Sequence, residues 1–230
     1  MRIEFITFTG ADDSTSISDL VKFTESRKNV EWGLLLSLSK SGSQRYPSPS
    51  WWDRFYQDDS NIYQQSAGHV CGKAAVQIGY GSWDMLDAKY ACLFPTYQIN
   101  LFGFKEPVSE NDFLSGLTDT LTDTIIMQAD GVHDYMVGFD YHKAHTNVRV
   151  LYDKSGGTGK LGEYVRPHPS IFSGYAGGYN PDNIMEEMKK LEQIVGDKEI
   201  WIDMESGIRT NNEFDLDKCK RVYDLVYSKY

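Results

Sequence analysis

Three glycine-rich turns are the places where this chain could bind an anion. They are the segments 153–160 (DKSGGTGK), 174–181 (GYAGGYNP) and 203–207 (DMESG), and each follows a short apolar run. Glycine lets the backbone approach a ligand closely, and a helix that follows such a turn points free N–H groups at an anion. Any one of these turns is equally well explained as a tight connection from a strand to a helix. Three in succession favour a phosphorylated ligand.

Eight apolar runs are expected to form the strands that position these turns. The runs are Ile3–Phe8, Trp32–Ser37, His69–Gly72, Tyr97–Leu101, Thr124–Gln128, Val148–Tyr152, Ile171–Ser173 and Ile200–Met204. Strands that alternate with helices imply right-handed crossovers and a parallel sheet. We therefore predict an α/β fold, a single (β/α)₈ TIM barrel domain spanning residues 1–230, with a doubly wound open sheet as the alternative. In such a barrel, the turns after the seventh and eighth strands are the usual phosphate site.

Two helices near the C-terminus have clear signals. Asn180 is expected to cap the first, with Pro181 in its first turn. Its apolar stripe comprises Ile184, Met188, Leu191 and Ile194, and that of the second helix comprises Leu216, Cys219, Val222 and Val226. The stretches 51–63 and 131–147 could each be helix or long loop. The aromatic residues of 51–63 favour a helix packed on the barrel over a cover for a ligand.

The charge balance excludes one class of partner. The chain has 23 Lys and Arg against 33 Asp and Glu, a formal charge of −10, whereas nucleic-acid binding needs concentrated basic residues. No apolar run approaches the roughly 18 to 20 residues that span a bilayer, and the N-terminus lacks the basic and apolar regions of a signal peptide. We therefore expect no nucleic-acid or membrane partner and a cytoplasmic location.

The cysteines and histidines indicate neither a disulfide framework nor a metal centre. Cys71, Cys92 and Cys219 are far apart and lie in apolar segments, which is typical of reduced thiols. His142 and His145 have no acidic or cysteine neighbours that would complete a metal site. No metal or cofactor is expected. His69, near a strand end, is expected to be a buried, hydrogen-bonded histidine.

The glycine-rich turns carry a family resemblance. LYDKSGGTGK (151–160), AGGYNPDN (176–183) and IDMESGIR (202–209) resemble the last three βα units of phosphoribosylanthranilate isomerase in order and spacing. Upstream, SQRYPSPSWW (43–52) is similar to that family's second βα loop and FTGADD (8–13) to its first. The resemblance is specific over about the C-terminal third of the chain. It implies a (β/α)₈ barrel that performs an Amadori rearrangement with a general acid and a general base.

The resemblance assigns the acid more readily than the base. It implies that Asp153, at the end of the sixth strand, is the general acid, although Asp153 could instead cap the glycine-rich turn. The family's base is a cysteine after the first strand, and here that position is Thr9. A threonine hydroxyl has no useful basicity near neutral pH unless another group activates it. Asp12 or Asp13 could supply a carboxylate, but such a pair more often forms a turn and a helix cap.

The remaining matches concern the two ends of the ligand. Arg45 matches the arginine that pairs with the substrate's carboxylate in the family, a role that a guanidinium can fill with two parallel hydrogen bonds. Glu205 stands where the family has a small hydroxyl residue, so it must point away from a phosphate, pair with Arg209, or meet another ligand group. The phosphate and its neighbours are expected at Gly156, Gly157, Gly177, Gly178, Ser206 and Gly207.

Two functional hypotheses remain. The first is an isomerase of the phosphoribosylanthranilate type, or one that acts on a related phosphosugar. The second is a binding protein that holds a phosphorylated sugar or nucleotide-like ligand without turnover. Retention of Asp153 and Arg45 favours the first, and the replacement of the cysteine by Thr9 favours the second. In either case we expect a small phosphorylated ligand and a monomer or homodimer.

Overall fold

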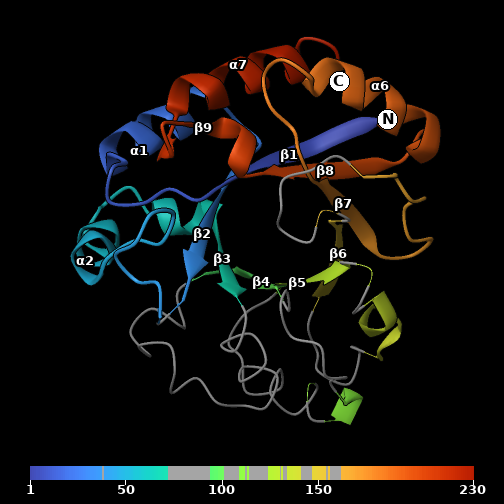
Figure 1. Ribbon diagram of the computed structural model, residues 1–230, viewed down its shortest axis with the longest axis horizontal. Helices are drawn as coiled ribbons and strands as arrows, with labels where there is room; N and C mark the ends of the chain where they lie inside the picture. The colour runs from blue at the N-terminus through green and yellow to red at the C-terminus, as the bar shows by residue number, and fades with distance from the viewer. Residues whose placement is uncertain are drawn as a thin grey trace.

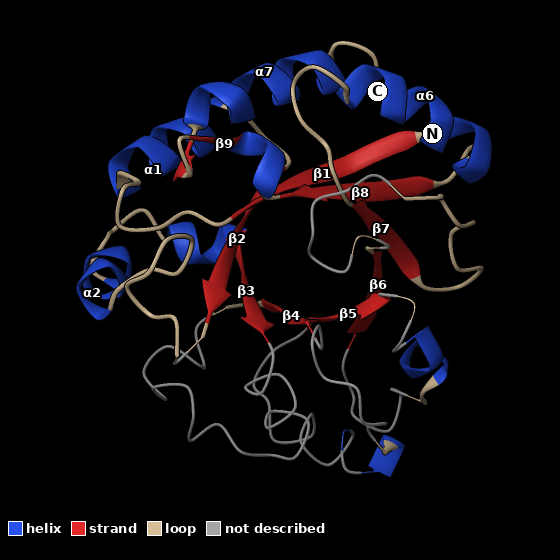
Figure 2. Cartoon of the chain, viewed as in Figure 1, coloured by secondary structure: helices blue, strands red, loops and turns tan. Residues whose placement is uncertain are grey.

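Eight parallel strands close into a barrel (Figures 1 and 2). The computed structural model describes residues 1–37, 39–71, 94–100, 109–111, 113, 124–129, 131, 134–140, 147–153, 155 and 162–230. The strands are β1 (Arg2–Thr9), β2 (Val30–Leu36), β3 (Ser66–Cys71), β4 (Thr96–Asn100), β5 (Thr124–Ala129), β6 (Asn147–Tyr152), β7 (Phe172–Ala176) and β8 (Glu199–Met204). Each pairs with its neighbours in sequence, and β1 also pairs with β8. This closure confirms the predicted barrel, and the open-sheet alternative is wrong.

The strands bury side chains on both faces, as strands of parallel sheets do. On the outer face, Phe8 and Trp32 each pack edge to face against Phe23 of helix α1 (Ile17–Ser26), and their own two rings pack tilted against each other. Inside the barrel, a smaller apolar cluster is built from Ile126, Leu151, Trp201, Phe5, Phe172 and Ala176. This inner cluster forms a closed floor beneath the carboxyl ends of the strands.

The seventh strand is longer than predicted, because Gly174 belongs to the strand and not to the turn. A Cβ on Gly174 would lie 2.1 Å from the Trp201 indole, so the missing side chain makes room for that ring inside the barrel. The strand therefore continues to Ala176, and the turn begins at Gly177. Gly174 is predicted to form part of the turn, but in the structure it lies in the strand and leaves room for the Trp201 ring inside the barrel.

The two C-terminal helices confirm the predicted apolar stripes, with small shifts. Helix α6 (Ile184–Val195) begins after Asn183, because Asn180 accepts hydrogen bonds from the amides of Asp182 and Asn183 and so forms a turn ahead of the helix. Val195 is buried, whereas Ile194, which was expected in the stripe, is exposed. Helix α7 (Leu216–Tyr227) is capped by the Asp215 side chain. Figure 1 shows α1, α6 and α7 together over β1 and β8.

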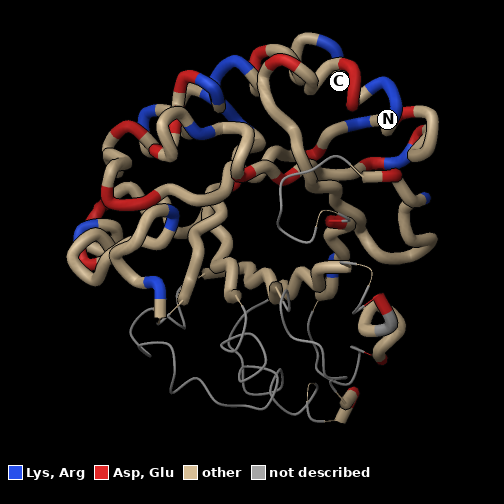
Figure 3. Tube along the Cα trace, viewed as in Figure 1, with Lys and Arg blue, Asp and Glu red and all other residues tan. Residues whose placement is uncertain are grey.

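The two segments that the sequence left open both contain helical turns. Helix α2 (Pro49–Tyr56) is followed by a short 3₁₀ helix, η1 (Ile62–Gln65), and the rings of Trp51, Trp52 and Phe55 are buried, as expected for a helix packed on the barrel. In the second segment, residues 134–138 form a 3₁₀ helix, η2 (Asp134–Gly138). Figure 3 shows charged residues concentrated on α1, α6, α7 and their connections, while most of the strand length is uncharged.

Candidate functional site

The carboxyl ends of the strands gather polar side chains inside the barrel. Residues two apart on a strand share a face, so Gln128 and Asp203, two positions beyond Ile126 and Trp201 of the inner cluster, also point inward. Six inward polar residues, each more than nine-tenths buried, form what we call the polar mouth. They are Thr9, His69, Gln98, Gln128, Asp153 and Asp203.

Thr9 and Asp203 form a buried pair on the adjacent strands β1 and β8. The Thr9 hydroxyl donates a hydrogen bond of 2.7 Å to Asp203 Oδ1. The pKa of Asp203 is raised to about 8, chiefly by burial and also by the negative charges of Glu205 and Asp153, although the bond from Thr9 acts in the opposite direction. A carboxyl group in such an environment holds its proton at neutral pH and can give it to a substrate.

Gly33 leaves space between Thr9 and a buried histidine. A Cβ on Gly33 would lie 2.2 Å from Thr9 Oγ1 and 3.0 Å from His69 Nε2, so both side chains converge above this glycine of β2. Burial lowers the pKa of His69 to about 3, so the imidazole is neutral at physiological pH. His69 is buried as predicted, and among the described residues its Nε2 has no hydrogen-bond partner, so the predicted hydrogen bond does not involve that atom.

Asp153 lies one residue beyond β6, where the resemblance implies the general acid. Its Oδ2 accepts a hydrogen bond of 2.9 Å from Gln128 Nε2. Its Oδ1 accepts bonds of 3.1 Å and 2.6 Å from the amide and the hydroxyl of Ser155. Donors to both oxygens suit an ionised carboxylate. Gly156 and Gly157, which were expected beside it, lie outside the described residues.

Cys71 brings a thiol to the strand ends, but not in a reactive form. Asn100 Nδ2 donates to Cys71 Sγ over 3.7 Å, and Gln98 Nε2 donates to Asn100 Oδ1 over 2.9 Å. The pKa of Cys71 is raised to about 11, chiefly by burial. This thiol is therefore protonated at neutral pH and does not replace the family's basic cysteine.

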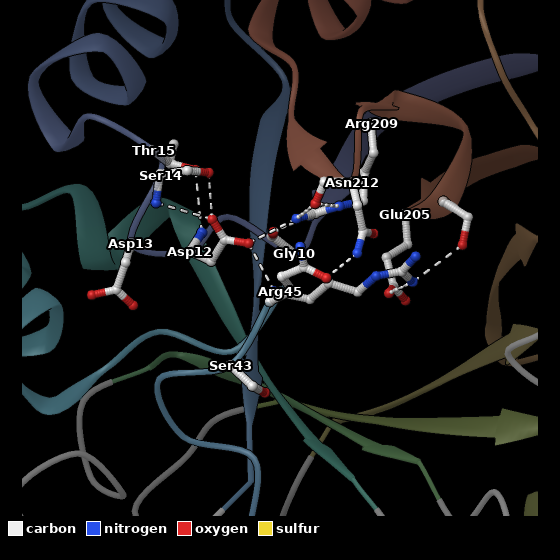
Figure 4. Close-up of polar contacts among 12 residues, drawn as sticks. Gly10, Asp12, Asp13, Ser14, Thr15, Ser43, Arg45, Glu205, Arg209 and Asn212 are labelled. Carbon is white, nitrogen blue, oxygen red and sulfur yellow. Dashed lines mark hydrogen bonds and ion pairs between the residues drawn. The ribbon is translucent and has the colours of Figure 1, made fainter.

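Asp12 and Arg209 form a buried ion pair at the rim (Figure 4). Arg209 Nη2 lies 2.7 Å from Asp12 Oδ2, and its Nη1 donates to the Gly10 carbonyl over 2.6 Å. Asp12 also accepts from the amides of Ser14 and Arg45. Burial acts to raise the pKa of Asp12, but these hydrogen bonds outweigh it and lower the pKa. Asp12 thus ties together the segments that follow β1, β2 and β8.

Asp13, the alternative carboxylate, also holds a loop. It accepts a hydrogen bond of 2.8 Å from the amide of Ser48, the residue that caps α2. Its side chain points away from the ion-paired residues in Figure 4.

Arg45 reaches the same rim but is already paired with a carboxylate of the protein. Its Nη1 lies 2.6 Å from Glu205 Oε1 and 3.3 Å from Ser206 Oγ. Of the three possibilities for Glu205, the structure therefore shows pairing with an arginine, but the arginine is Arg45 and not Arg209. About 30% of each side chain of this pair is exposed.

The turns after β7 and β8 lie against each other, as a shared anion site requires. Gly177 and Gly178 have φ values of 117° and 69°, which other residues rarely adopt. Gly207, in the short 3₁₀ helix η4 (Ser206–Ile208), lies so close to the Tyr179 carbonyl that a Cβ would fall 1.9 Å from it. The structure thus brings together Gly177, Gly178, Ser206 and Gly207, four of the residues expected at the phosphate.

Four residues of the polar mouth, among them Gln98 of β4, received no functional role from the sequence. The sequence pattern identifies Asp203 only as the start of a glycine-containing turn, His69 only as a core residue, and Gln128 only as the end of a strand. The signal that could have found them is the alternation along each strand. It places them on the same face as the inner apolar cluster but at the open end.

The described part of the chain contains neither a metal-ligating group nor a membrane-spanning helix. No cluster of three or more His, Cys, Asp and Glu side chains there is arranged to hold a metal ion. Within the same residues, no helix combines the length and apolar character needed to cross a bilayer.

Comparison with known proteins supports the barrel. No family model matches this chain. Among solved structures, it is similar to monomers generated from the dimeric phosphoribosylanthranilate isomerase of Thermotoga maritima, with a TM-score of 0.58, 17% identity and coverage of 100% of both chains. It is equally similar to a phosphoribosylanthranilate isomerase in complex with reduced 1-(o-carboxyphenylamino)-1-deoxyribulose 5-phosphate (TM-score 0.58, 16% identity, 100% of both chains). The chain therefore has the fold of a phosphoribosylanthranilate-isomerase-like barrel.

Proposed function

We propose that this protein binds a phosphorylated ribose-type ligand in the polar mouth and isomerises it by an Amadori-type rearrangement. The observation that carries the proposal is the pair of buried carboxyl groups, Asp153 and Asp203, at the ends of β6 and β8. They flank β7, whose following turn lies against that of β8. A site with two carboxyl groups in different environments can both donate and accept a proton.

The phosphate end of the ligand belongs at the turns after β7 and β8. Gly177 and Gly178 expose backbone there, and Ser206 and Gly207 come from the facing turn. Neutral N–H groups can hold a single phosphate with few basic side chains, so a net charge of −10 does not oppose this ligand. The similar isomerase that was solved with a phosphorylated ligand makes this class of compound the first to test.

The raised pKa of Asp203 favours it as the proton donor, and the position of Asp153 at the end of β6 makes it the candidate proton acceptor. Asp203 has a pKa of about 8 and would protonate the ring oxygen as the ring opens. As the ring C–O bond breaks, the nitrogen lone pair would form a C=N bond to the first sugar carbon. Asp153, whose two oxygens accept hydrogen bonds, would then remove the proton from the second sugar carbon. The C–H electron pair would form a double bond between the two carbons, the C=N pair would return to nitrogen, and the resulting enol would tautomerise to the ketone. This assignment reverses the role that the resemblance implies for Asp153. Thr9 positions the Asp203 carboxyl group, and Asp12 has a structural role in holding the rim segments together.

A second candidate is a binding protein without turnover. It is favoured by Thr9, which stands in place of the family's base, and by the pairing of Arg45 with Glu205. Such a protein would use the same turns for phosphate but would not need the two buried carboxyl groups.

The deciding experiment is fluorescence-monitored turnover of phosphoribosylanthranilate, together with calorimetry of ribose 5-phosphate. We expect turnover by the parent protein and a loss of about 10²- to 10⁴-fold in kcat for Asp153→Asn and for Asp203→Asn. Binding of ribose 5-phosphate without turnover by the parent would support the binding protein instead. Absence of binding would contradict both proposals. In a parent without turnover, activity in Thr9→Cys would identify a barrel that lacks only its base.

A further inference from the structure

Two buried polar atoms of the mouth have no hydrogen-bond partner within the described part of the chain. They are Nε2 of His69 and Oε1 of Gln128, in side chains that are 1% and 7% exposed. An unpaired buried polar group destabilises the fold, so proteins retain one mainly where a ligand or water supplies its hydrogen-bond partner. Both atoms lie on the inner face of the barrel, one on β3 and one on β5.

The position of β3 places His69 across the barrel from the phosphate turns. In a closed ring of eight strands in sequence order, β3 and β4 lie opposite β7 and β8. A ribose phosphate held at the β7 and β8 turns and extended across the opening would therefore reach His69 on β3, and it would pass Gln128 on β5, two strands from β7. These two side chains are placed to recognise the group carried by the sugar.

The orientation of the Gln128 amide determines which partner it needs. Its Nε2 faces Asp153 Oδ2 at 2.9 Å, and a carboxylate oxygen that accepts must face the NH₂ end of an amide. The unpaired end is therefore the carbonyl oxygen, which requires a hydrogen-bond donor. A carboxylate on the ligand has no donor to offer, whereas a carboxamide has two N–H groups and an acceptor.

His69 fits the same kind of partner. Burial keeps its imidazole neutral, with a pKa of about 3, so it gives no positive charge that would favour an anion. A neutral imidazole has one donor and one acceptor nitrogen. It therefore complements an uncharged amide and gains nothing from a second anionic group.

The two rim arginines reinforce this preference because each is already neutralised. Arg45 is paired with Glu205 at 2.6 Å and Arg209 with Asp12 at 2.7 Å. A carboxylate on the ligand would have to displace Glu205 from Arg45. It would also add a negative charge near Asp153 and Asp203, which is unfavourable.

We propose that the group opposite the phosphate is uncharged and bears hydrogen-bond donors, of the carboxamide class, and that His69 and Gln128 bind it in preference to an aromatic carboxylate. This inference rests on the proposed function, because it takes the phosphate end to lie at the β7 and β8 turns. It narrows the substrate class from any N-substituted ribose phosphate to one with an amide at that end.

The test compares two ligands that differ only in this group. Calorimetry would measure the affinity of 1-(arylamino)-1-deoxyribulose 5-phosphates in reduced form, one with an ortho-carboxamide and one with an ortho-carboxylate. We expect the carboxamide to bind the parent protein at least about tenfold more tightly, the factor that corresponds to one hydrogen-bond difference of about 1.4 kcal/mol. Equal affinity, or tighter binding of the carboxylate, would overturn the inference.

Single substitutions test which residues cause the preference for the carboxamide ligand. Gln128→Leu and His69→Leu should each reduce the preference for the carboxamide, whereas the exposed Gln193→Leu should keep it. Glu205→Gln, which frees Arg45, should shift the preference toward the carboxylate. A preference that persists in both Gln128→Leu and His69→Leu would contradict the assignment. Binding of ribose 5-phosphate tests the proposed function separately from the further inference. If ribose 5-phosphate binds but the carboxamide ligand is not preferred, only the further inference is wrong. If ribose 5-phosphate does not bind, the proposed function is wrong.

Discussion

The two sides of the barrel opening differ in whether their polar side chains have partners. At the rim, beyond β1, β2 and β8, two ion pairs join the loops: Asp12 with Arg209, and Arg45 with Glu205. On the β3 and β5 side of the opening, one buried polar atom of His69 and one of Gln128 have no hydrogen-bond partner among the described residues. Paired groups make a rigid frame, whereas unpaired ones lower stability until something binds. This difference fits the proposal that the rim holds the loops in place and that the β3 and β5 side binds the ligand.

The largest expected effect comes from breaking the rim. Asp12→Ala leaves the Arg209 guanidinium buried without its carboxylate, and the loss of a partner in a buried ion pair costs about 3–5 kcal/mol. Denaturant unfolding would measure this loss. The exposed pair of Asp182 with Arg221 is the control, and Asp182→Ala should cost less than about 1 kcal/mol. Equal effects from the two variants would mean that the rim is not a frame.

The next effect concerns the pH dependence of the mouth. Because the pKa of Asp203 is raised to about 8 in the folded state, the folded protein holds this proton more tightly than the unfolded chain. The associated stability is present below the unfolded pKa and is lost as pH rises through the folded pKa. Between pH 5 and pH 7 we expect a loss of up to about 1.4 kcal/mol per pH unit.

Asp203→Asn provides the comparison for that measurement, because it removes the titrating group and keeps its shape. Its stability should fall less than that of the parent between pH 5 and pH 7, as measured by urea unfolding at several pH values. Parallel profiles for the two proteins would show that Asp203 is not the group responsible.

A third change fills the space that Gly33 leaves. Gly33→Ala would bring a methyl group within 2.2 Å of Thr9 Oγ1 and within 3.0 Å of two atoms of the His69 ring. Overpacking of this kind costs about 1–3 kcal/mol, and it should also weaken ligand binding because it displaces both side chains. Gly138→Ala is the matched control, since a Cβ there meets no atom within 4 Å. Thermal melting and calorimetry would separate the two variants.

The smallest effect should appear on the unpaired side and could have the opposite sign. His69→Leu removes an unpaired buried nitrogen and keeps a similar volume, so the free energy of unfolding should change by less than about 1 kcal/mol and could rise. Chemical denaturation without ligand would measure it. A loss as large as that of Asp12→Ala would mean that His69 is part of the frame, and the contrast between the two halves would disappear.

The sequence by itself determined the barrel. Eight short apolar runs, separated by helical or turn segments, predicted eight parallel strands, and each lies within three residues of its observed position. It also identified the turns at Gly177, Gly178 and Gly207, since glycine at a strand end reports a local backbone requirement. Such features depend on neighbours along the chain, which a sequence displays directly. The roles of Asp153, Thr9 and Arg45 remain predictions.

Only the tertiary structure determined which polar side chains pair with one another. That Arg45 meets Glu205, that Arg209 meets Asp12, and that Thr9 meets Asp203 depends on contacts between residues 160, 197 and 194 positions apart. Barrel closure creates these contacts, and no local pattern encodes them. The raised pKa of Asp203 and the unpaired atoms of His69 and Gln128 follow from the same closure, because burial exists only once all eight strands surround the mouth.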